Sequence, residues 1–211
     1  MKILVVGGSA GCGALSVQQA LSRGYQVTAF SRNPQNLAIE HANLTRVAGD
    51  FHNPDDVAKA VAGHDAVIVT AAGRGLRTYK DNRGYFTDGT KNVIDAMTKL
   101  SAKRLVVLSA YGVAESRAAN PFYVRWVVFD WIIKYPYADH ERQEALVRAT
   151  DLDWVIARPS LLTDGPAKGK SVRAPGDRSV PSRISRADVA TFLVDACDHD
   201  TWVKQAINLG G

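Results

Sequence analysis

The chain has 211 residues, of which 46% are hydrophobic and 22% are charged, and these ordinary globular proportions exclude a disordered or fibrous protein. Its 26 Lys and Arg residues exceed its 21 Asp and Glu residues, and the net charge of +5 attracts anions without selecting among them. Because the basic residues form no run of five and no module with interleaved aromatics, we expect no nucleic-acid partner.

The sequence also argues against a membrane span, a signal peptide and a metal site. The most apolar long stretch, 122–135, is interrupted by Arg125 and Asp130 and cannot cross a bilayer. The start of the chain lacks the apolar region and cleavage site of a signal peptide, so we expect a cytoplasmic protein. Cys12 and Cys197 lie far apart without metal-ligand spacing, so we predict no disulfide and no metal.

Short apolar, β-branched segments alternate with helical segments along the chain. The predicted strands are, in chain order, 3–6, 27–30, 44–47, 66–70, 105–108, 154–157 and 207–209. One intervening helix is expected to start at the cap Asn53 and to end before Gly63. The alternation predicts an α/β fold: a Rossmann-type doubly wound parallel sheet in a single domain, 1–211, with helices on both faces. Segments 110–140 and 160–185 are expected to supply the substrate side.

A glycine-rich turn connects the first predicted strand to the first predicted helix. It comprises Gly7, Gly8, Ser9, Ala10, Gly11, Cys12 and Gly13. Glycines let the backbone turn tightly and approach a pyrophosphate, whose charge is stabilised by the N–H groups at the start of the helix. A glycine-rich turn without a ligand is the alternative. Because strand, turn and helix coincide, we predict a dinucleotide-binding site.

The residues after the second and third strands indicate which dinucleotide is bound. An acidic residue after the second strand would bind the adenine ribose of NAD, but Ser31 and Arg32 stand there instead. Since a guanidinium pairs well with a 2′-phosphate and Ser31 can donate to it, we predict NADP(H). The alternative is that Arg32 is a solvated turn arginine. After the third strand, Asp50 and Phe51 either border the adenine, or Asp50 only caps the turn.

Two later segments leave more than one interpretation. Residues 163–181 are rich in Gly, Pro, Lys and Arg without periodicity, which predicts a long surface loop or lid. The following helix is expected to begin near Ser185 or Arg186, with Asp188 in its first turn. The aromatic segment 122–133 is typical of a core helix, a dimer surface or, less often, the wall of a substrate cleft.

With these motifs in place, the chain resembles the atypical short-chain dehydrogenase/reductases, in the NAD(P)H-binding branch of biliverdin reductase B (flavin reductase) and NmrA-like proteins. Gly7, Ala10 and Gly13 match the family's G-x-x-G-x-x-G turn, with alanine at the middle glycine. Ser31, Arg32 and Asp50 also match the branch. The resemblance implies further cofactor-binding residues: Ala71, Ala72 and Gly73 over the adenine ribose and phosphates, and Pro159 and Ser160 beside the nicotinamide.

The catalytic candidates are Ser109, Tyr111 and His140. Classical members of the superfamily use a tyrosine and a lysine four residues later as an acid–base pair, but no such pair exists here. The resemblance places His140 where the lysine-bearing helix passes the nicotinamide, with a surface or capping histidine as the alternative. Ser109 resembles the superfamily's active-site serine and Tyr111 is near it, unless both are ordinary strand-end polar groups.

Two hypotheses follow for the function. The first is an NADPH-dependent reductase that transfers a hydride to a small planar acceptor such as a flavin or a quinone. The second is a non-catalytic NADP(H)-binding redox sensor of the NmrA-like kind. An isomerase or dehydratase has no residues that argue for it. We expect a monomer or a homodimer.

Overall fold

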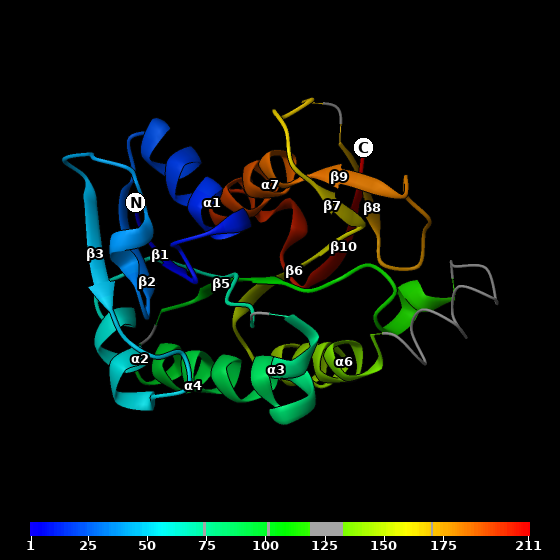
Figure 1. Cartoon of the computed structure of the whole chain (residues 1–211), viewed down its shortest axis with the longest axis horizontal. Helices are drawn as coiled ribbons and strands as arrows, with labels where there is room; N and C mark the ends of the chain where they lie inside the picture. The colour runs from blue at the N-terminus through cyan, green and yellow to red at the C-terminus, as the bar shows by residue number, and fades with distance from the viewer. Residues whose placement is uncertain (74, 101, 119–132, 170) are drawn as a thin grey trace.

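The computed structural model describes residues 1–73, 75–100, 102–118, 133–169 and 171–211, and its centre is an eight-stranded sheet (Figure 1). The strands run in the order β3 (Leu44–Ala48), β2 (Gln26–Ser31), β1 (Lys2–Val6), β4 (Ala66–Val69), β5 (Arg104–Leu108), β6 (Asp153–Pro159), β10 (Gln205–Gly210) and β8 (Val172–Pro175). All pairs are parallel except β8 with β10. The predicted Rossmann-type α/β fold and all of its predicted strands are confirmed.

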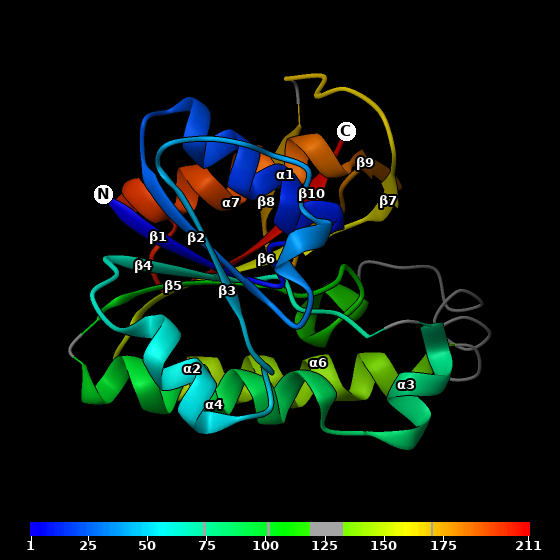
Figure 2. The ribbon, with the colours of Figure 1, turned by 60° about the vertical axis from the view of Figure 1, so that its left-hand side comes forward.

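Helices cover both faces of the sheet (Figures 1 and 2). One face carries α1 (Gly11–Ser22) and α7 (Arg186–Asp198), which pack against each other. The other face carries α2 (Pro54–Val61), α4 (Tyr85–Lys99) and α6 (Lys134–Arg148), with the short α3 (Gly75–Asp81) beside α6. Single 3₁₀ turns occur at Pro34–Asn36, Ala114–Arg117 and Asp200–Trp202.

The two layers of helices create two hydrophobic cores, one on each face of the sheet. In β1, Ile3 and Val5 belong to the core under α1 and α7, whereas Leu4 and Val6 belong to the core under α2 and α4. Successive side chains of a strand point to opposite faces, so a strand buried on both faces must be apolar throughout. This is why the central strands lack the apolar–polar alternation of a half-exposed sheet.

The predicted helix boundaries agree with the structure at two caps. The side chain of Asn53 accepts hydrogen bonds from the N–H groups of Asp55 and Asp56 at the start of α2. The Ser185 hydroxyl accepts the N–H of Asp188 at 3.0 Å at the start of α7. Both side chains satisfy N–H groups that have no partner inside the helix.

The prediction of a long surface loop or lid over 163–181 is wrong in part. Residues Val172–Pro175 form β8, which pairs antiparallel with β10 at the edge of the sheet. The segments flanking this region, β7 (Leu161–Thr163) and β9 (Arg183–Ser185), pair with each other as a small parallel sheet. A four-residue edge strand between Gly- and Pro-rich turns is too short to give a periodic pattern, which explains the error.

Side chains from the core also hold this region in place. The buried carboxylate of Asp188 accepts the N–H groups of Lys168 and Gly169 at 3.0–3.1 Å. The amide of Asn208 donates to the carbonyls of Gly176 and Arg178. The loops on both sides of β8 are therefore tied to α7 and β10, which argues against a freely moving lid.

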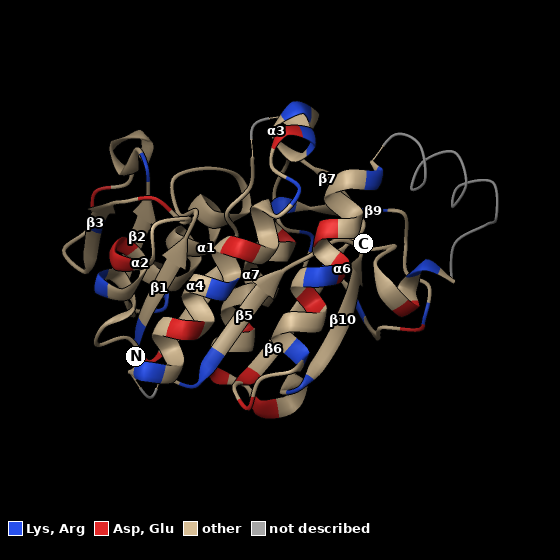
Figure 3. Cartoon of the chain, turned by 90° about the horizontal axis from the view of Figure 1, so that it is seen from below, with Lys and Arg blue, Asp and Glu red and all other residues tan. Residues whose placement is uncertain are grey.

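Charged residues of both signs are interspersed over the helices and strands (Figure 3). Within the described parts of the chain, no helix combines the length and apolar character needed to cross a bilayer. The predicted aromatic segment 122–133 falls outside the described residues, apart from Ile133.

Candidate functional site

The sheet has its switch point between β1 and β4, which are neighbours although β2 and β3 lie between them in the chain. In open α/β sheets, ligands bind outside the carboxyl ends of the strands at such a point. A cleft of about 420 Å³ lies there, and we name it the glycine-turn cleft. It is bordered by the turn after β1, the ends of β2 and β3, and the segment after β4. Its wall includes Gly7, Ser9, Ala10, Gly11, Cys12, Ser31, Arg32, Asp50, Phe51, Thr70, Ala71, Ala72, Gly73 and Arg186.

Two glycines of the turn are required by its packing. Gly7 has φ of +85°, and a Cβ atom there would lie 2.7 Å from the backbone of Ala71. A Cβ atom on Gly13 would overlap the carbonyl oxygen of Gly7 and lie 2.6 Å from Oγ1 of Thr70. The turn after β1 therefore packs directly against the residues that follow β4, and Gly7, Ser9, Ala10 and Gly11 of the turn border the cleft.

The start of α1 borders the same cleft and has no side-chain cap. Ala10, at the cap position, makes no side-chain hydrogen bond, and the first turn of α1 carries no acidic residue. By contrast, α2 and α7 each have a capping side chain and an acidic residue in the first turn. Uncapped N–H groups and the positive end of the helix dipole suit an anion such as a phosphate group.

The predicted 2′-phosphate and adenine residues also meet at this cleft. The Ser31 hydroxyl is buried and has no hydrogen-bond partner among the described residues, next to Arg32 in the cleft wall. Asp50 accepts the N–H of His52 at 2.9 Å, a contact that lowers the pKa of its carboxyl group. Asp50 therefore does cap the turn, as one interpretation predicted, and borders the cleft as well. The Phe51 ring is buried against Gly89 of α4.

A second and larger cleft, of about 750 Å³, opens beside the first one. We name it the aromatic cleft, because Tyr79, Phe86, Tyr111, Tyr137 and His140 lie in its wall with mostly apolar neighbours. The two clefts share wall residues Thr70, Ala71, Ala72, Leu108, Leu162 and Arg186. They are therefore neighbouring parts of one site. The predicted residues Ser109, Pro159 and Ser160 lie in the wall of the aromatic cleft.

His140 is buried in the aromatic cleft wall, so the alternative of a surface histidine is wrong. The residue is 8% exposed, and its ring stacks on Phe86 with centroids 3.8 Å apart. Gln143 donates its amide N–H to Thr90 Oγ1 at 2.8 Å, which turns its carbonyl oxygen toward Nδ1 of His140, also at 2.8 Å. Nδ1 of the neutral ring therefore carries the hydrogen and Nε2 is an acceptor. Burial lowers the pKa of His140, which favours this neutral form.

The Ser109 hydroxyl is engaged below the cleft and does not offer its hydrogen to it. It donates to Oε1 of Glu144 at 2.6 Å, and the same oxygen accepts Nε of Arg158 at 2.8 Å. Arg158 is fully buried, and its guanidinium also reaches Glu115 at 3.1 Å. Ser109 is thus part of a buried ionic network, which the sequence analysis did not anticipate.

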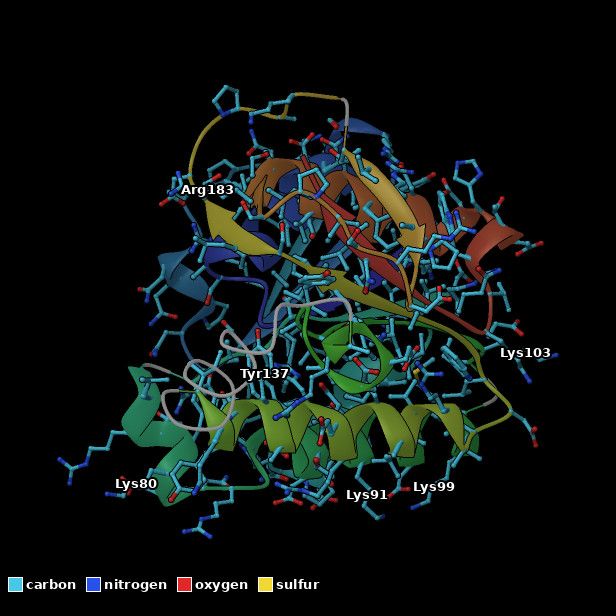
Figure 4. The ribbon with its side chains drawn as sticks, turned by 90° about the vertical axis from the view of Figure 1, so that its right-hand side faces the viewer. Lys80, Lys91, Lys99, Lys103, Tyr137 and Arg183 are labelled. Carbon is cyan, nitrogen blue, oxygen red and sulfur yellow. The ribbon has the colours of Figure 1, made fainter. Side chains whose placement is uncertain are left out.

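The two tyrosines of the cleft are linked to each other. Tyr137 donates its hydroxyl to the carbonyl oxygen of Tyr111 at 2.8 Å. Figure 4 shows Tyr137 on the side of α6 that faces the sheet, whereas Lys91 and Lys99 point away from the helical layer. Burial raises the pKa of Tyr137 to about 12 and also raises the pKa of Tyr111. Neither phenol is a readily ionised acid.

Several site residues differ from the predicted set. Gly8 and Gly13 border neither cleft and instead support the turn. The sequence prediction missed wall residues Thr70, Tyr79, Phe86, Tyr137, Leu162 and Arg186. One missed signal was spacing: Tyr137 precedes His140 by three residues, which places both on one face of a helix. Another was the arginine at 158 inside an apolar strand, which indicates a buried ion pair.

Residues 7–200 match the model of a protein family described as NAD(P)H-binding. The chain is 30% identical over 224 aligned residues to a UPF0659 protein of Saccharomyces cerevisiae, covering 99% of this chain and 92% of that protein. It is 38% identical over 120 residues to a 3-beta-hydroxysteroid dehydrogenase of Mycolicibacterium neoaurum, but the alignment covers 53% of this chain and only 32% of that longer protein. The fold matches that of a short-chain dehydrogenase/reductase from Veillonella parvula solved with NADP, with a TM-score of 0.84, 18% identity, and coverage of 100% of this chain and 94% of the other.

Proposed function

Because the chain belongs to the NAD(P)H-binding family, we propose that it is a reductase that uses NADPH to deliver a hydride to a planar acceptor such as a flavin or a quinone. The observation that carries this proposal is the junction of the two clefts. A dinucleotide held by the glycine turn extends toward the wall that the clefts share, and the aromatic cleft lies on the other side of that wall.

The residues of the glycine-turn cleft fit the phosphate groups of NADPH. The glycine-rich turn that borders the cleft and the uncapped start of α1 suit the pyrophosphate. The buried Ser31 hydroxyl, which has no partner among the described residues, suits a 2′-phosphate together with Arg32. Asp50 then borders the adenine, and the segment 71–73 borders the phosphates and the ribose.

The chemistry of the aromatic cleft fits an acceptor that needs no strong acid from the protein. NADPH, when bound, supplies the hydride. Pro159 and Ser160 border its nicotinamide end, and the rings of Tyr79 and Phe86 provide flat apolar walls for a planar molecule. The tyrosines hold their protons tightly and the Ser109 hydroxyl is committed to Glu144. A reduced flavin or quinone can take its proton from water, so positioning is the protein's main task.

His140 contributes a hydrogen-bond acceptor to this cleft rather than a charge. Its neutral ring offers the Nε2 lone pair, which suits an N–H group of an acceptor or a ribose hydroxyl. Replacing His140 with Ala should lower kcat at saturating NADPH several-fold, whereas the binding of 2′-phosphoadenosine compounds stays constant. An unchanged kcat and KM would remove His140 from the mechanism.

The proposal is tested by measuring oxidation of NADPH and NADH with FMN, riboflavin and menadione as acceptors, together with the Kd of each nucleotide. We expect turnover that is selective for NADPH and requires one of these acceptors. Tight and selective NADPH binding without turnover of any acceptor would contradict the reductase and support the redox sensor. The segments 110–140 and 160–185 are proposed to form the acceptor side, because their described residues line the aromatic cleft.

A further inference from the structure

We propose that Arg186 binds the pyrophosphate of NADPH from the side opposite the glycine turn and fixes the nicotinamide end at the junction of the two clefts. This inference rests on the proposed cofactor site and deepens it. Arg186 is the first residue of α7, and its side chain lies in the walls of both the glycine-turn cleft and the aromatic cleft. No motif of the sequence marks this residue as part of the cofactor site.

Of the two cationic side chains described in the wall of the glycine-turn cleft, Arg186 is the one placed to bind the pyrophosphate. Among the described residues in its wall, those with a full charge are Arg32, Asp50 and Arg186. Arg32 follows β2 and serves the 2′-phosphate at the adenine end. NADPH carries a second doubly charged group, the pyrophosphate, between the adenosine and the nicotinamide riboside. Arg186 lies where the cleft continues toward the acceptor, at the correct end for this second group.

Arg186 also lies close to the glycine turn that faces the pyrophosphate. The positive charge of Arg186 acts on the Cys12 thiol in the first turn of α1, partly offsetting the effect of burial, which raises the pKa of that thiol to about 11. Cys12 borders the glycine-turn cleft at the start of the uncapped helix. A phosphate at this helix start is therefore within the field of the Arg186 guanidinium.

The present partner of Arg186 is one that a phosphate can replace. Nη1 of Arg186 lies 2.6 Å from Oδ1 of Asp164, whose side chain is 93% exposed. Because Asp164 is almost fully in solvent, the ion pair is screened and contributes little free energy, about 1 kcal/mol or less. A pyrophosphate in a partly enclosed cleft offers more charge and fixed acceptors. The nearby acid Asp188 is buried and occupied by the loop N–H groups of Lys168 and Gly169.

The test is the Kd of three ligands, NADPH, ADP-ribose and adenosine 2′-monophosphate, for the wild type and for Arg186→Gln. ADP-ribose contains the pyrophosphate, whereas adenosine 2′-monophosphate lacks it. We expect Arg186→Gln to weaken NADPH and ADP-ribose about ten-fold or more and to leave adenosine 2′-monophosphate unchanged. Arg186→Lys should retain part of the affinity, because the charge is kept but the planar pair of donors is lost.

Arg183→Gln is the matched control, because Arg183 lies three residues earlier, is exposed and borders neither cleft (Figure 4). It should change none of the three Kd values. Equal losses for all three ligands in Arg186→Gln, or no loss for ADP-ribose, would overturn the inference. So would an unchanged Kd for NADPH with a raised KM for FMN relative to riboflavin, because Arg186 would then bind the acceptor's phosphate. ADP-ribose binding needs no turnover, so the inference can hold even where the reductase proposal fails.

Discussion

The glycine-turn cleft and the aromatic cleft are built in different ways. The first is formed largely by short contiguous segments that follow β1, β2, β3 and β4, and many of the residues in its wall are Gly, Ala or Ser. The second is formed by side chains from α3, α4, α6 and the segments after β5 and β6, which are far apart in the chain. A site made of short segments at strand ends depends on local sequence, whereas a site made of distant side chains depends on packing.

The polar groups of the two clefts differ in the same way. In the glycine-turn cleft, the Ser31 hydroxyl and the start of α1 lack protein partners among the described residues and can accept a ligand. Below the aromatic cleft, Glu144 accepts hydrogen bonds from both Ser109 and Arg158, although Nη1 of Arg158 has no hydrogen-bond partner among the described residues. The network of Ser109, Glu144 and Arg158 therefore holds the wall of the aromatic cleft in shape, while the Ser31 hydroxyl is open to a ligand. In the aromatic cleft the buried hydroxyl of Ser160 also has no partner among the described residues.

The largest expected effect comes from breaking this network. Arg158→Met leaves the carboxylate of Glu144, which is 1% exposed, beside the Ser109 hydroxyl without its buried partner cation, and with only the more distant Arg148 at 3.7 Å. Removing one partner of a buried ion pair typically costs about 3–5 kcal/mol. Urea unfolding should show a loss of this size in the free energy of unfolding.

Arg148→Met is the control for this variant, because Arg148 reaches Glu115 and Glu144 from a position that is 37% exposed. It should cost about 1 kcal/mol or less. Adding Glu144→Gln to Arg158→Met should restore part of the lost stability, since the unpaired charge is removed. Equal losses for Arg158→Met and Arg148→Met would contradict the role assigned to the network.

A smaller and more selective effect is expected in the glycine-turn cleft. Arg32→Ala should weaken NADPH binding about ten-fold or more, the value of one charge-assisted contact, and should change NADH binding little. Fluorescence titration of the reduced nicotinamide gives both Kd values. Equal losses for the two nucleotides would show that Arg32 does not recognise the 2′-phosphate.

The smallest effect concerns the pH dependence of stability. Burial raises the pKa of Glu115, but hydrogen bonds from Arg158 and Arg148 outweigh it and bring the pKa from 4.5 to about 2. Because the folded pKa lies below the unfolded one, this carboxylate stabilises the fold above about pH 4.5 and loses that contribution as the pH falls toward 2. The difference in unfolding free energy between wild type and Glu115→Gln should shrink across this window. A difference that is independent of pH there would contradict the assignment.

The same contrast explains what could be predicted from the sequence. The strands, the doubly wound parallel sheet that they form, and the caps Asn53 and Ser185 follow from local patterns, and they are confirmed. The glycine turn is found where it was predicted, because its residues are consecutive. Tyr137 and Arg186 were missed, since only the packing of α6 and α7 against the sheet brings them to the cleft wall.

The strand β8 was missed for a related reason. Its pairing with β10 is set by a partner more than 30 residues away, and by the Asn208 amide that holds the carbonyls after it. No pattern within the local sequence of 163–181 predicts either interaction. The burial of His140 likewise depends on Phe86 of another helix, so its neutral state could not be derived from the motif around it.

The proposed acceptor site is tested most directly by a variant that fills the aromatic cleft and leaves the glycine-turn cleft intact. Ala110 lies in the wall of the aromatic cleft and not in that of the glycine-turn cleft, so Ala110→Trp places a large ring where the acceptor is proposed to bind. The measurement is the Kd for NADPH together with kcat/KM for the best acceptor found with the wild type. We predict an unchanged Kd and a loss of kcat/KM of about ten-fold or more, since one blocked contact worth about 1.4 kcal/mol is already ten-fold. An unchanged kcat/KM would contradict the claim that the acceptor binds in the aromatic cleft, beside the end of the bound cofactor.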